Sequence, residues 1–134
     1  MAPRLFRVII PVAEIERGAE FYSSLLEMPG ERVSSDRHYF DCGGTILACA
    51  QPFDHATEQP IAEEAFRPNP DHIYLSVPDV DAMRAHALGV DGATVSSEVE
   101  MQPWGERSFY VTDPFGNQLC FVAAGTEFTS GFVP

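Results

Sequence analysis

Three side chains in this sequence have the chemistry of a ligand-binding or catalytic site: Arg7, His72 and Cys120. An imidazole can bind a metal or transfer a proton, and a thiolate can bind a metal or act as a nucleophile. Cys120 also has an apolar residue on either side, which is typical of a small buried side chain. Three roles are therefore open for Cys120: metal ligand, nucleophile or packing. The elements that position these residues decide among the roles.

The stretch "VTDPFGNQLCFV", residues 111–122, predicts a hairpin that fixes the position of Cys120. Asp113, Pro114 and Gly116 occupy the first, second and fourth positions of a type I turn, and Gly116 is free to adopt φ > 0. Apolar, strand-like runs flank the turn on both sides. Cys120 is thus expected on the return strand.

The chain repeats one pattern twice. "RVIIPVAEIE" from Arg7 aligns with "HIYLSVPDVD" from His72, and "DCGGTILACA" aligns with "DPFGNQLCFV". In each half a strand is followed by a helical pattern and then by three more strands, among them the one expected over "ATVSSEVEM". In the first helix the apolar positions Ile15, Ala19, Tyr22 and Leu26 recur at helical spacing. The expected organisation is a first module over 1–52, a linker rich in proline and acid over 53–70, a second module over 71–126 and a tail over 127–134.

The repeat also assigns residues to faces of the sheet. Because side chains alternate along a strand, Arg7 and His72 occupy equivalent places, as do Ala48 and Cys120. One module alone leaves the inner face of its sheet exposed, so two modules must pack, within the chain or across a homodimer. We expect an α+β fold in which two β-α-β-β-β modules form a curved, barrel-like sheet with a concave cavity and the helices outside. The four equivalent positions are expected to converge on the concave face.

These features resemble the vicinal oxygen chelate superfamily, which includes glyoxalases, extradiol dioxygenases and bleomycin-resistance proteins. The resemblance rests on the duplicated pattern, "FYSSLL" in the first helix, "VPDVD" and "DPFGN". The stretch "QPWGERSFYVTDPFGNQLCFVAA" is further similar to the C-terminal part of bleomycin-resistance proteins.

The resemblance implies a place for a divalent ion, but this sequence departs from the usual ligand set. The four converging positions carry histidine, glutamate or glutamine in the metal-dependent members, and only His72 matches. Arg7 has no lone pair to offer, Ala48 has no donor, and Cys120 stands in place of glutamate. Catalytic metals normally keep about three protein ligands. No metal cofactor is therefore predicted, although a divalent ion completed by other ligands stays an alternative.

Without a metal, the concave face is expected to be a small-molecule cavity. Its predicted polar contacts are Arg7, His72 and Tyr74, its stacking surfaces are Trp104 and Tyr110, and Cys120 forms a wall. The alternative for Cys120 is a nucleophilic role. In that case His72 or Arg7 would activate the thiol by lowering its pKa.

The composition of the chain argues against nucleic acid and membranes as partners. Twenty acidic and eight basic side chains give a formal charge of −12, which opposes binding to nucleic acid. No stretch reaches the roughly 20 apolar residues of a membrane span, and "MAPRLFRVII" lacks the pattern of a signal peptide. The three cysteines form no C-x-x-C pair. A cytoplasmic protein with reduced thiols and no membrane partner is expected.

Three functions are compatible with this sequence. The first is metal-independent binding that sequesters an aromatic or cationic compound, as in resistance proteins. The alternative is a lyase, isomerase or ring-cleaving dioxygenase with a non-standard or metal-free site that uses His72 as acid and base. The third is a dimerisation or regulatory module with a vestigial pocket. The fold alone does not decide among them.

Overall fold

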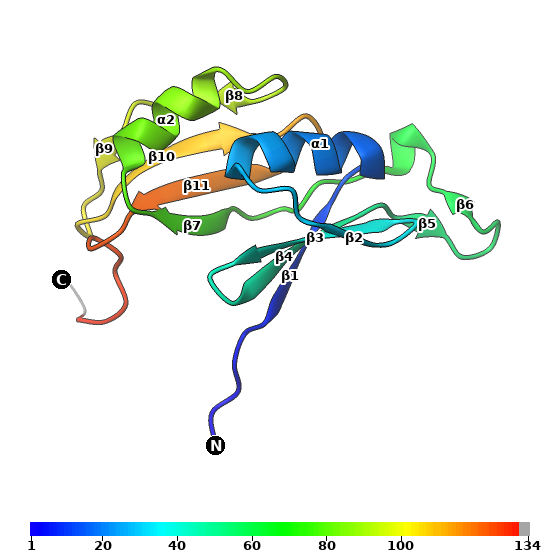
Figure 1. Cartoon of the computed structure of the whole chain (residues 1–134), viewed down its shortest axis with the longest axis horizontal. Helices are drawn as coiled ribbons and strands as arrows, with labels where there is room; N and C mark the ends of the chain where they lie inside the picture. The colour runs from blue at the N-terminus through cyan, green and yellow to red at the C-terminus, as the bar shows by residue number, and fades with distance from the viewer. Residues whose placement is uncertain (132–134) are drawn as a thin grey trace. The chain divides into compact units, whose positions relative to one another are not determined.

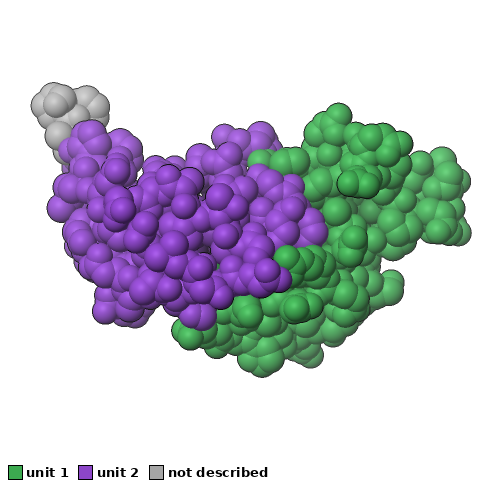
Figure 2. All heavy atoms as spheres, turned by 90° about the horizontal axis from the view of Figure 1, so that it is seen from above, with its two compact units in different colours: residues 1–69 green, residues 70–134 purple. Residues whose placement is uncertain are grey.

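The computed structural model describes residues 1–131, and the chain divides into two compact units, residues 1–69 and residues from Pro70 onward (Figure 2). Each unit contains one α-helix and a sheet with both parallel and antiparallel strand pairs. The predicted α+β class is therefore confirmed. No helix among residues 1–131 combines the length and the apolar character needed to cross a membrane.

The first unit follows the predicted order of strand, helix and three strands. Its elements are β1 (Arg7–Pro11), α1 (Ile15–Leu26), β2 (Glu31–Ser34), β3 (Arg37–Cys42) and β4 (Thr45–Ala50) (Figure 1). The strands lie in the order β1-β4-β3-β2, with β1 parallel to β4 and the other neighbours antiparallel. The breaks between β2 and β3 and between β3 and β4 fall at Asp36 and at the glycine pair Gly43–Gly44.

Helix α1 buries one face against the sheet of its unit. Ile15, Ala19 and Tyr22 are buried as predicted, but Leu25 is fully buried where Leu26 was expected. The helix ends at Glu27, which adopts φ 54° and donates its backbone N–H to the Ser23 carbonyl. This left-handed end turns the chain ahead of the strand that follows.

Residues 53–69, expected as a linker, belong to the first unit. They contain the two-residue strands β5 (Phe53–Asp54) and β6 (Gln59–Pro60), which pair with each other, and the 3₁₀ turn η1 (Glu63–Ala65). The Asn69 side-chain amide donates to the Ile9 carbonyl at 3.1 Å. This hydrogen bond connects the end of the segment to β1.

The second unit repeats the topology of the first. Its elements are β7 (Ile73–Val77), α2 (Val80–Leu88), β8 (Thr94–Val95), β9 (Glu100–Met101), β10 (Arg107–Thr112) and β11 (Gln118–Ala123). The strand order is β7-β11-β10-β8, β9 also pairs with β10, and β7 runs parallel to β11. Figure 1 shows α2 lying across β10 and β11. Asp79 caps this helix by accepting from the Ala82 N–H at 3.0 Å.

One strand prediction in this unit is wrong. The continuous strand expected over "ATVSSEVEM" is divided into β8 and β9, with residues 96–99 outside any strand. The Ser97 hydroxyl accepts the Tyr110 N–H at 3.0 Å, and the Ser96 N–H donates to the Tyr110 carbonyl at 3.1 Å. A serine side chain thus replaces part of the backbone ladder, which short hydroxyl side chains do readily.

The predicted hairpin between β10 and β11 is confirmed, and Asp113 and Asn117 at the two ends of its turn are buried. The Gly116 N–H donates to the Asp113 carbonyl at 3.2 Å, and Gly116 has φ 94°. The Asp113 carboxylate accepts the backbone N–H groups of Phe115 and Asn117 and the Asn117 side-chain amide, each at 2.8 Å. These bonds lock the turn and thereby fix the register of the two strands.

Candidate functional site

Four of the predicted site residues lie together in the second unit. Cys120 on β11 is in register with Tyr74 on β7 and with Tyr110 on β10, so the three side chains share one face of the sheet. His72 immediately precedes β7, and its ring centroid lies 5.1 Å from that of Tyr110 and 6.2 Å from that of Tyr74. The structure thus brings these four residues together, and their role in binding a ligand stays a prediction.

Cys120 is a buried thiol within this group. Its side chain is 1% exposed, and burial raises the pKa of the thiol, while hydrogen bonds from Ser108 and Tyr110 oppose that shift only in part. Burial, followed by the proximity of Cys120, also raises the pKa of Tyr110. Both groups thus hold their protons at neutral pH. This is the opposite of the thiolate activation considered for Cys120.

The first unit contains the equivalent group with different chemistry. Ala48 on β4 is in register with Ile9 on β1 and with Tyr39 on β3, and Ala48 is fully buried. The exposed Arg7 guanidinium lies 5.1 Å from the Tyr39 ring centroid and 5.0 Å from that of Phe6, which is cation–π geometry. Arg7 thus contacts Tyr39, which is in register with the buried Ala48. In the same way His72 contacts Tyr110, which is in register with the buried Cys120.

A pocket of about 450 Å³ adjoins the His72 face within the second unit. Tyr74, Ser76 and Val122 line it from one face of the sheet. Tyr74 and Ser76 are two residues apart on β7 and so point to the same side, and Ser76 is in register with Val122 on β11. Its complete lining is Tyr74, Leu75, Ser76, Trp104, Glu106, Val122, Glu127 and Phe128. The pocket therefore contains two predicted residues, Tyr74 and Trp104, beside residues that the sequence did not identify.

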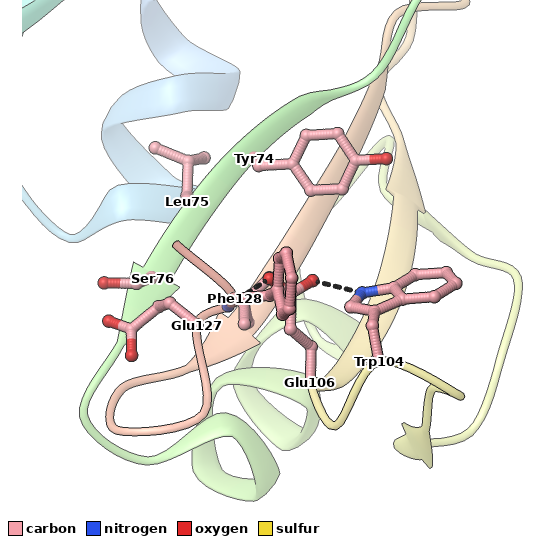
Figure 3. A pocket seen from close by; sticks show the side chains of 8 residues that line it. Tyr74, Leu75, Ser76, Trp104, Glu106, Glu127 and Phe128 are labelled. Carbon is pink, nitrogen blue, oxygen red and sulfur yellow. Dashed lines mark hydrogen bonds between the residues drawn. The ribbon is translucent and has the colours of Figure 1, made fainter. Parts of the chain in front are cut away.

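Trp104 enters the pocket from a tight turn between β9 and β10. The turn is closed by the Gly105 N–H, which donates to the Gln102 carbonyl at 2.8 Å, and Gly105 has the positive φ of 94° that favours glycine. The Trp104 indole N–H donates to Glu106 Oε1 at 2.8 Å, and the indole is 45% exposed. Figure 3 shows this hydrogen bond at the edge of the pocket.

The chain after β11 forms another wall of the pocket through Glu127 and Phe128, the first two residues of the predicted tail. The Thr126 hydroxyl donates to the Ala123 carbonyl at 2.6 Å and accepts the Arg107 N–H at 3.2 Å. The Phe128 N–H donates to Glu106 Oε2 at 2.8 Å, which holds the Phe128 side chain at the pocket. The rest of the predicted tail, residues 132–134, lies outside the described residues.

Two carboxylates give the pocket negative charge. Glu106 is half-buried and Glu127 is exposed, and hydrogen bonds from the backbone N–H groups of Glu127 and Gly125 lower the pKa of Glu127. The only sequence signal for Glu106 was its place two residues after Trp104 in "PWGERSF". Glu127 and Phe128 carried no signal, because their roles depend on the path of the chain after β11.

The donors on these faces do not suit a divalent cation. In the second unit they are a half-buried imidazole, two phenols and a protonated buried thiol, and in the first unit Arg7 and Ala48 offer no lone-pair donor. Within residues 1–131, no group of three or more His, Cys, Asp or Glu side chains is arranged to hold a metal ion.

The paired β-α-β-β-β units and the turn "DPFGN" define the class of protein. The model of the Glyoxalase/Bleomycin resistance protein/Dioxygenase superfamily matches residues 4–121. The chain belongs to this superfamily, which confirms the resemblance seen in the sequence.

Solved structures share the fold at low sequence identity. A glyoxalase-related enzyme from Fulvimarina pelagi is 14% identical with a TM-score of 0.72, and the match covers 98% of this chain and 100% of that one. A glyoxalase/bleomycin resistance protein from Albidiferax ferrireducens is 22% identical with a TM-score of 0.68, and the match covers 88% and 97% of the two chains. These likenesses concern the fold alone.

A curated relative matches over a shorter stretch. An uncharacterized protein of Mycobacterium tuberculosis is 51% identical over 45 residues, which are 34% of this chain and 26% of that protein. The match thus spans about a quarter of the relative's length.

Proposed function

We propose that this chain binds a small aromatic or cationic molecule in the pocket of its second unit and does so without a metal. The observation that carries the proposal is the lining of that pocket: Tyr74, Trp104 and Phe128 supply aromatic surface, and Glu106 and Glu127 supply negative charge. Aromatic rings bind flat or cationic groups, and carboxylates favour positive charge. The formal charge of −12 acts in the same direction.

Sequestration fits this pocket better than turnover. The thiol and the phenol beside it, Cys120 and Tyr110, have raised pKa values and keep their protons at neutral pH. Neither group is then a ready nucleophile or base. The expected curved, barrel-like assembly, the homodimer and the cytoplasmic location stay predictions, and the proposed binding does not depend on them.

The single tryptophan of the chain makes the proposal directly testable. Trp104 lines the pocket, so its fluorescence should change when a ligand binds. Titration in the presence of EDTA with a cationic glycopeptide, with planar aromatic cations and with neutral aromatic metabolites should give saturable binding of at least one cation. Calorimetry gives the same constants without relying on fluorescence. Failure of every compound to bind under metal-free conditions would falsify the proposal.

Matched variants localise the binding. Trp104→Phe keeps an aromatic ring and should retain most of the calorimetric affinity, whereas Trp104→Ala should weaken binding by about fivefold or more. Phe53→Leu alters an aromatic residue of β5 that is absent from the pocket lining and serves as the control. Equal loss in the Phe53 variant would show that the effect is not local.

An enzyme of the lyase, isomerase or dioxygenase type is the second candidate. It is favoured by the contact of His72 with Tyr110, because an imidazole on the face that continues into the pocket is placed to transfer protons. Metal analysis of the purified protein and turnover assays with His72→Ala test it. A stoichiometric divalent ion that is lost in the His72 variant would favour this candidate over simple binding.

A further inference from the structure

Glu106 organises the pocket through both of its carboxylate oxygens. Oε1 accepts the Trp104 indole N–H and Oε2 accepts the Phe128 backbone N–H, each at 2.8 Å. One carboxylate therefore joins the turn before β10 to the segment after β11. In Figure 3 it lies between the Trp104 indole and Phe128, with the Tyr74 ring above both in this view.

The three aromatic residues come from separate segments and keep open surface. Tyr74 on β7 is 60% exposed, Trp104 is 45% exposed and Phe128 is 42% exposed. Aromatic side chains of this kind that surround a space beside a carboxylate attract cations through the negative faces of their rings. This geometry favours a compact cation over a long apolar chain.

The hydrogen bonds of the carboxylates narrow the class of cation further. Each oxygen of Glu106 already accepts a protein N–H, and Glu127 Oε1 accepts the Gly125 N–H at 2.5 Å, so each of these three oxygens has one of its two lone-pair sites taken. A primary ammonium brings three N–H donors that lose their water on binding and need acceptors in exchange. A fully alkylated ammonium brings none, and its methyl groups can lie against the rings.

We propose that this pocket selects a quaternary ammonium group, held by cation–π contact with Tyr74, Trp104 and Phe128 and by the charge of Glu106. The inference rests on the proposed function and names the chemical class of the ligand. Glu106 acts in two ways: it supplies charge, and it positions two of the aromatic residues.

Three probes that share one ethanol scaffold separate charge from alkylation. Choline is quaternary, ethanolamine carries a primary ammonium, and 3,3-dimethylbutan-1-ol is the neutral isostere of choline. By calorimetry in EDTA, choline should bind about tenfold tighter than either of the others, which is within the range of cation–π stabilisation. Equal or tighter binding of ethanolamine, or of the neutral alcohol, would overturn the inference.

Variants test the assigned residues. Tyr74→Leu and Trp104→Leu should each weaken choline binding about fivefold. Glu106→Gln should weaken it as well and should shift Trp104 emission in the free protein, because the amide cannot accept at both positions. Glu100→Gln makes the same change of charge on β9 outside the pocket lining and should leave affinity and emission unchanged. Unchanged choline affinity in all three pocket variants, with folding verified by circular dichroism, would contradict the assignment.

The result also separates this inference from the function on which it rests. Binding of a planar aromatic cation, but not of choline, would refute the quaternary ammonium class and leave the proposed binding function intact. Failure of every compound to bind, the neutral aromatic metabolites and the cationic glycopeptide included, would refute both.

Discussion

His72 packs against Tyr110 with 5.1 Å between the ring centroids and 65° between the ring planes. In the first unit, Arg7 lies 5.1 Å from the ring centroid of Tyr39. Tyr39 is in register with Ala48, as Tyr110 is with Cys120. The two halves of the chain thus pack equivalent positions in the same way. The second has the His72 imidazole and the Cys120 thiol where the first has the Arg7 guanidinium and the Ala48 methyl group.

This correspondence favours packing as the role of Cys120. Its equivalent, Ala48, is small and fully buried, and a buried thiol of similar size fits the same place. Hydrogen bonding to Ser108 and Tyr110 satisfies the sulfur without ionising it.

The first prediction is that Cys120 reacts slowly with iodoacetamide. Burial raises the pKa of this thiol above its ordinary value of 9.0, so the reactive thiolate is scarce at neutral pH. In a Cys42→Ser, Cys49→Ala background, labelling at pH 7.5 followed by mass spectrometry should be much slower in the folded than in the urea-unfolded chain. His72→Ala should leave the rate unchanged. Rapid labelling that slows in the His72 variant would instead restore the activated thiolate.

The repeat made much of this fold predictable from the sequence. The equivalence of Arg7 with His72 and of Ala48 with Cys120 follows from aligning the two halves, and the strand registers bear it out: Ile9 pairs with Ala48, and Tyr74 pairs with Cys120. Successive side chains of a strand point to opposite faces of the sheet because of local backbone geometry alone. A correct alignment of the two halves therefore also assigns each residue to its face of the sheet.

The pocket was less predictable because its walls depend on side-chain bonds between distant segments. Glu106 and Phe128 are separated by 22 residues and meet only because the chain after β11 returns to the start of β10. No local periodicity encodes such a contact. Likewise the division between β8 and β9 depends on the Ser97 hydroxyl, which accepts the Tyr110 N–H in place of a backbone carbonyl. Strand propensity does not encode which of these acceptors the N–H takes.

The second prediction concerns the turn between β10 and β11. Asp113→Ala removes the acceptor of three hydrogen bonds and leaves the N–H groups of Phe115 and Asn117 without that partner. Loss of an acceptor for a buried donor, here the Asn117 N–H, costs about 1–3 kcal/mol, so urea unfolding should show a fall in stability of about this size. The exposed Asp71→Ala is the matched control and should change little. Similar stability of both variants would show that the turn bonds contribute little.

The third prediction is a pH-dependent contribution from the ion pair of Glu16 and Arg32. Their side chains lie 2.8 Å apart, and the hydrogen bond and charge of Arg32 lower the pKa of Glu16 from its ordinary value of 4.5. The contribution is therefore fully present above pH 4.5 and is lost as the pH falls through the lowered folded pKa, because the unfolded chain takes up the proton first. Because both side chains are partly or largely exposed, the effect should be small.

A comparison of Glu16→Gln with the parent protein measures this contribution. The melting temperatures should differ slightly at pH 7 and converge as the pH drops well below 4.5. Addition of salt should reduce the difference at pH 7, since exposed charges are screened. A difference that grows toward acid pH would contradict the assigned direction of the pKa shift.

The fourth prediction concerns the close approach of α1 to the end of β1. A Cβ atom on Gly18 would lie 2.8–2.9 Å from the side-chain atoms of the fully buried Val12. Alanine favours a helix more than glycine does, yet overpacking a core typically costs about 1–3 kcal/mol, so Gly18→Ala should destabilise the protein in urea unfolding. Gly89→Ala is the control, because its added Cβ would meet only the His86 carbonyl oxygen at 3.6 Å, an ordinary contact.

A double-mutant cycle separates this clash from other effects of the substitution. Val12→Ala removes both γ-methyl groups that a Cβ on Gly18 would meet and leaves only the Cβ of residue 12, so the added methyl group of Gly18→Ala should occupy part of the vacated space. The double variant should therefore be more stable than the sum of the single effects implies, by at least about 0.5 kcal/mol. Strict additivity would mean that the helix adjusts without contact with Val12, and that glycine at this position serves another purpose than close packing.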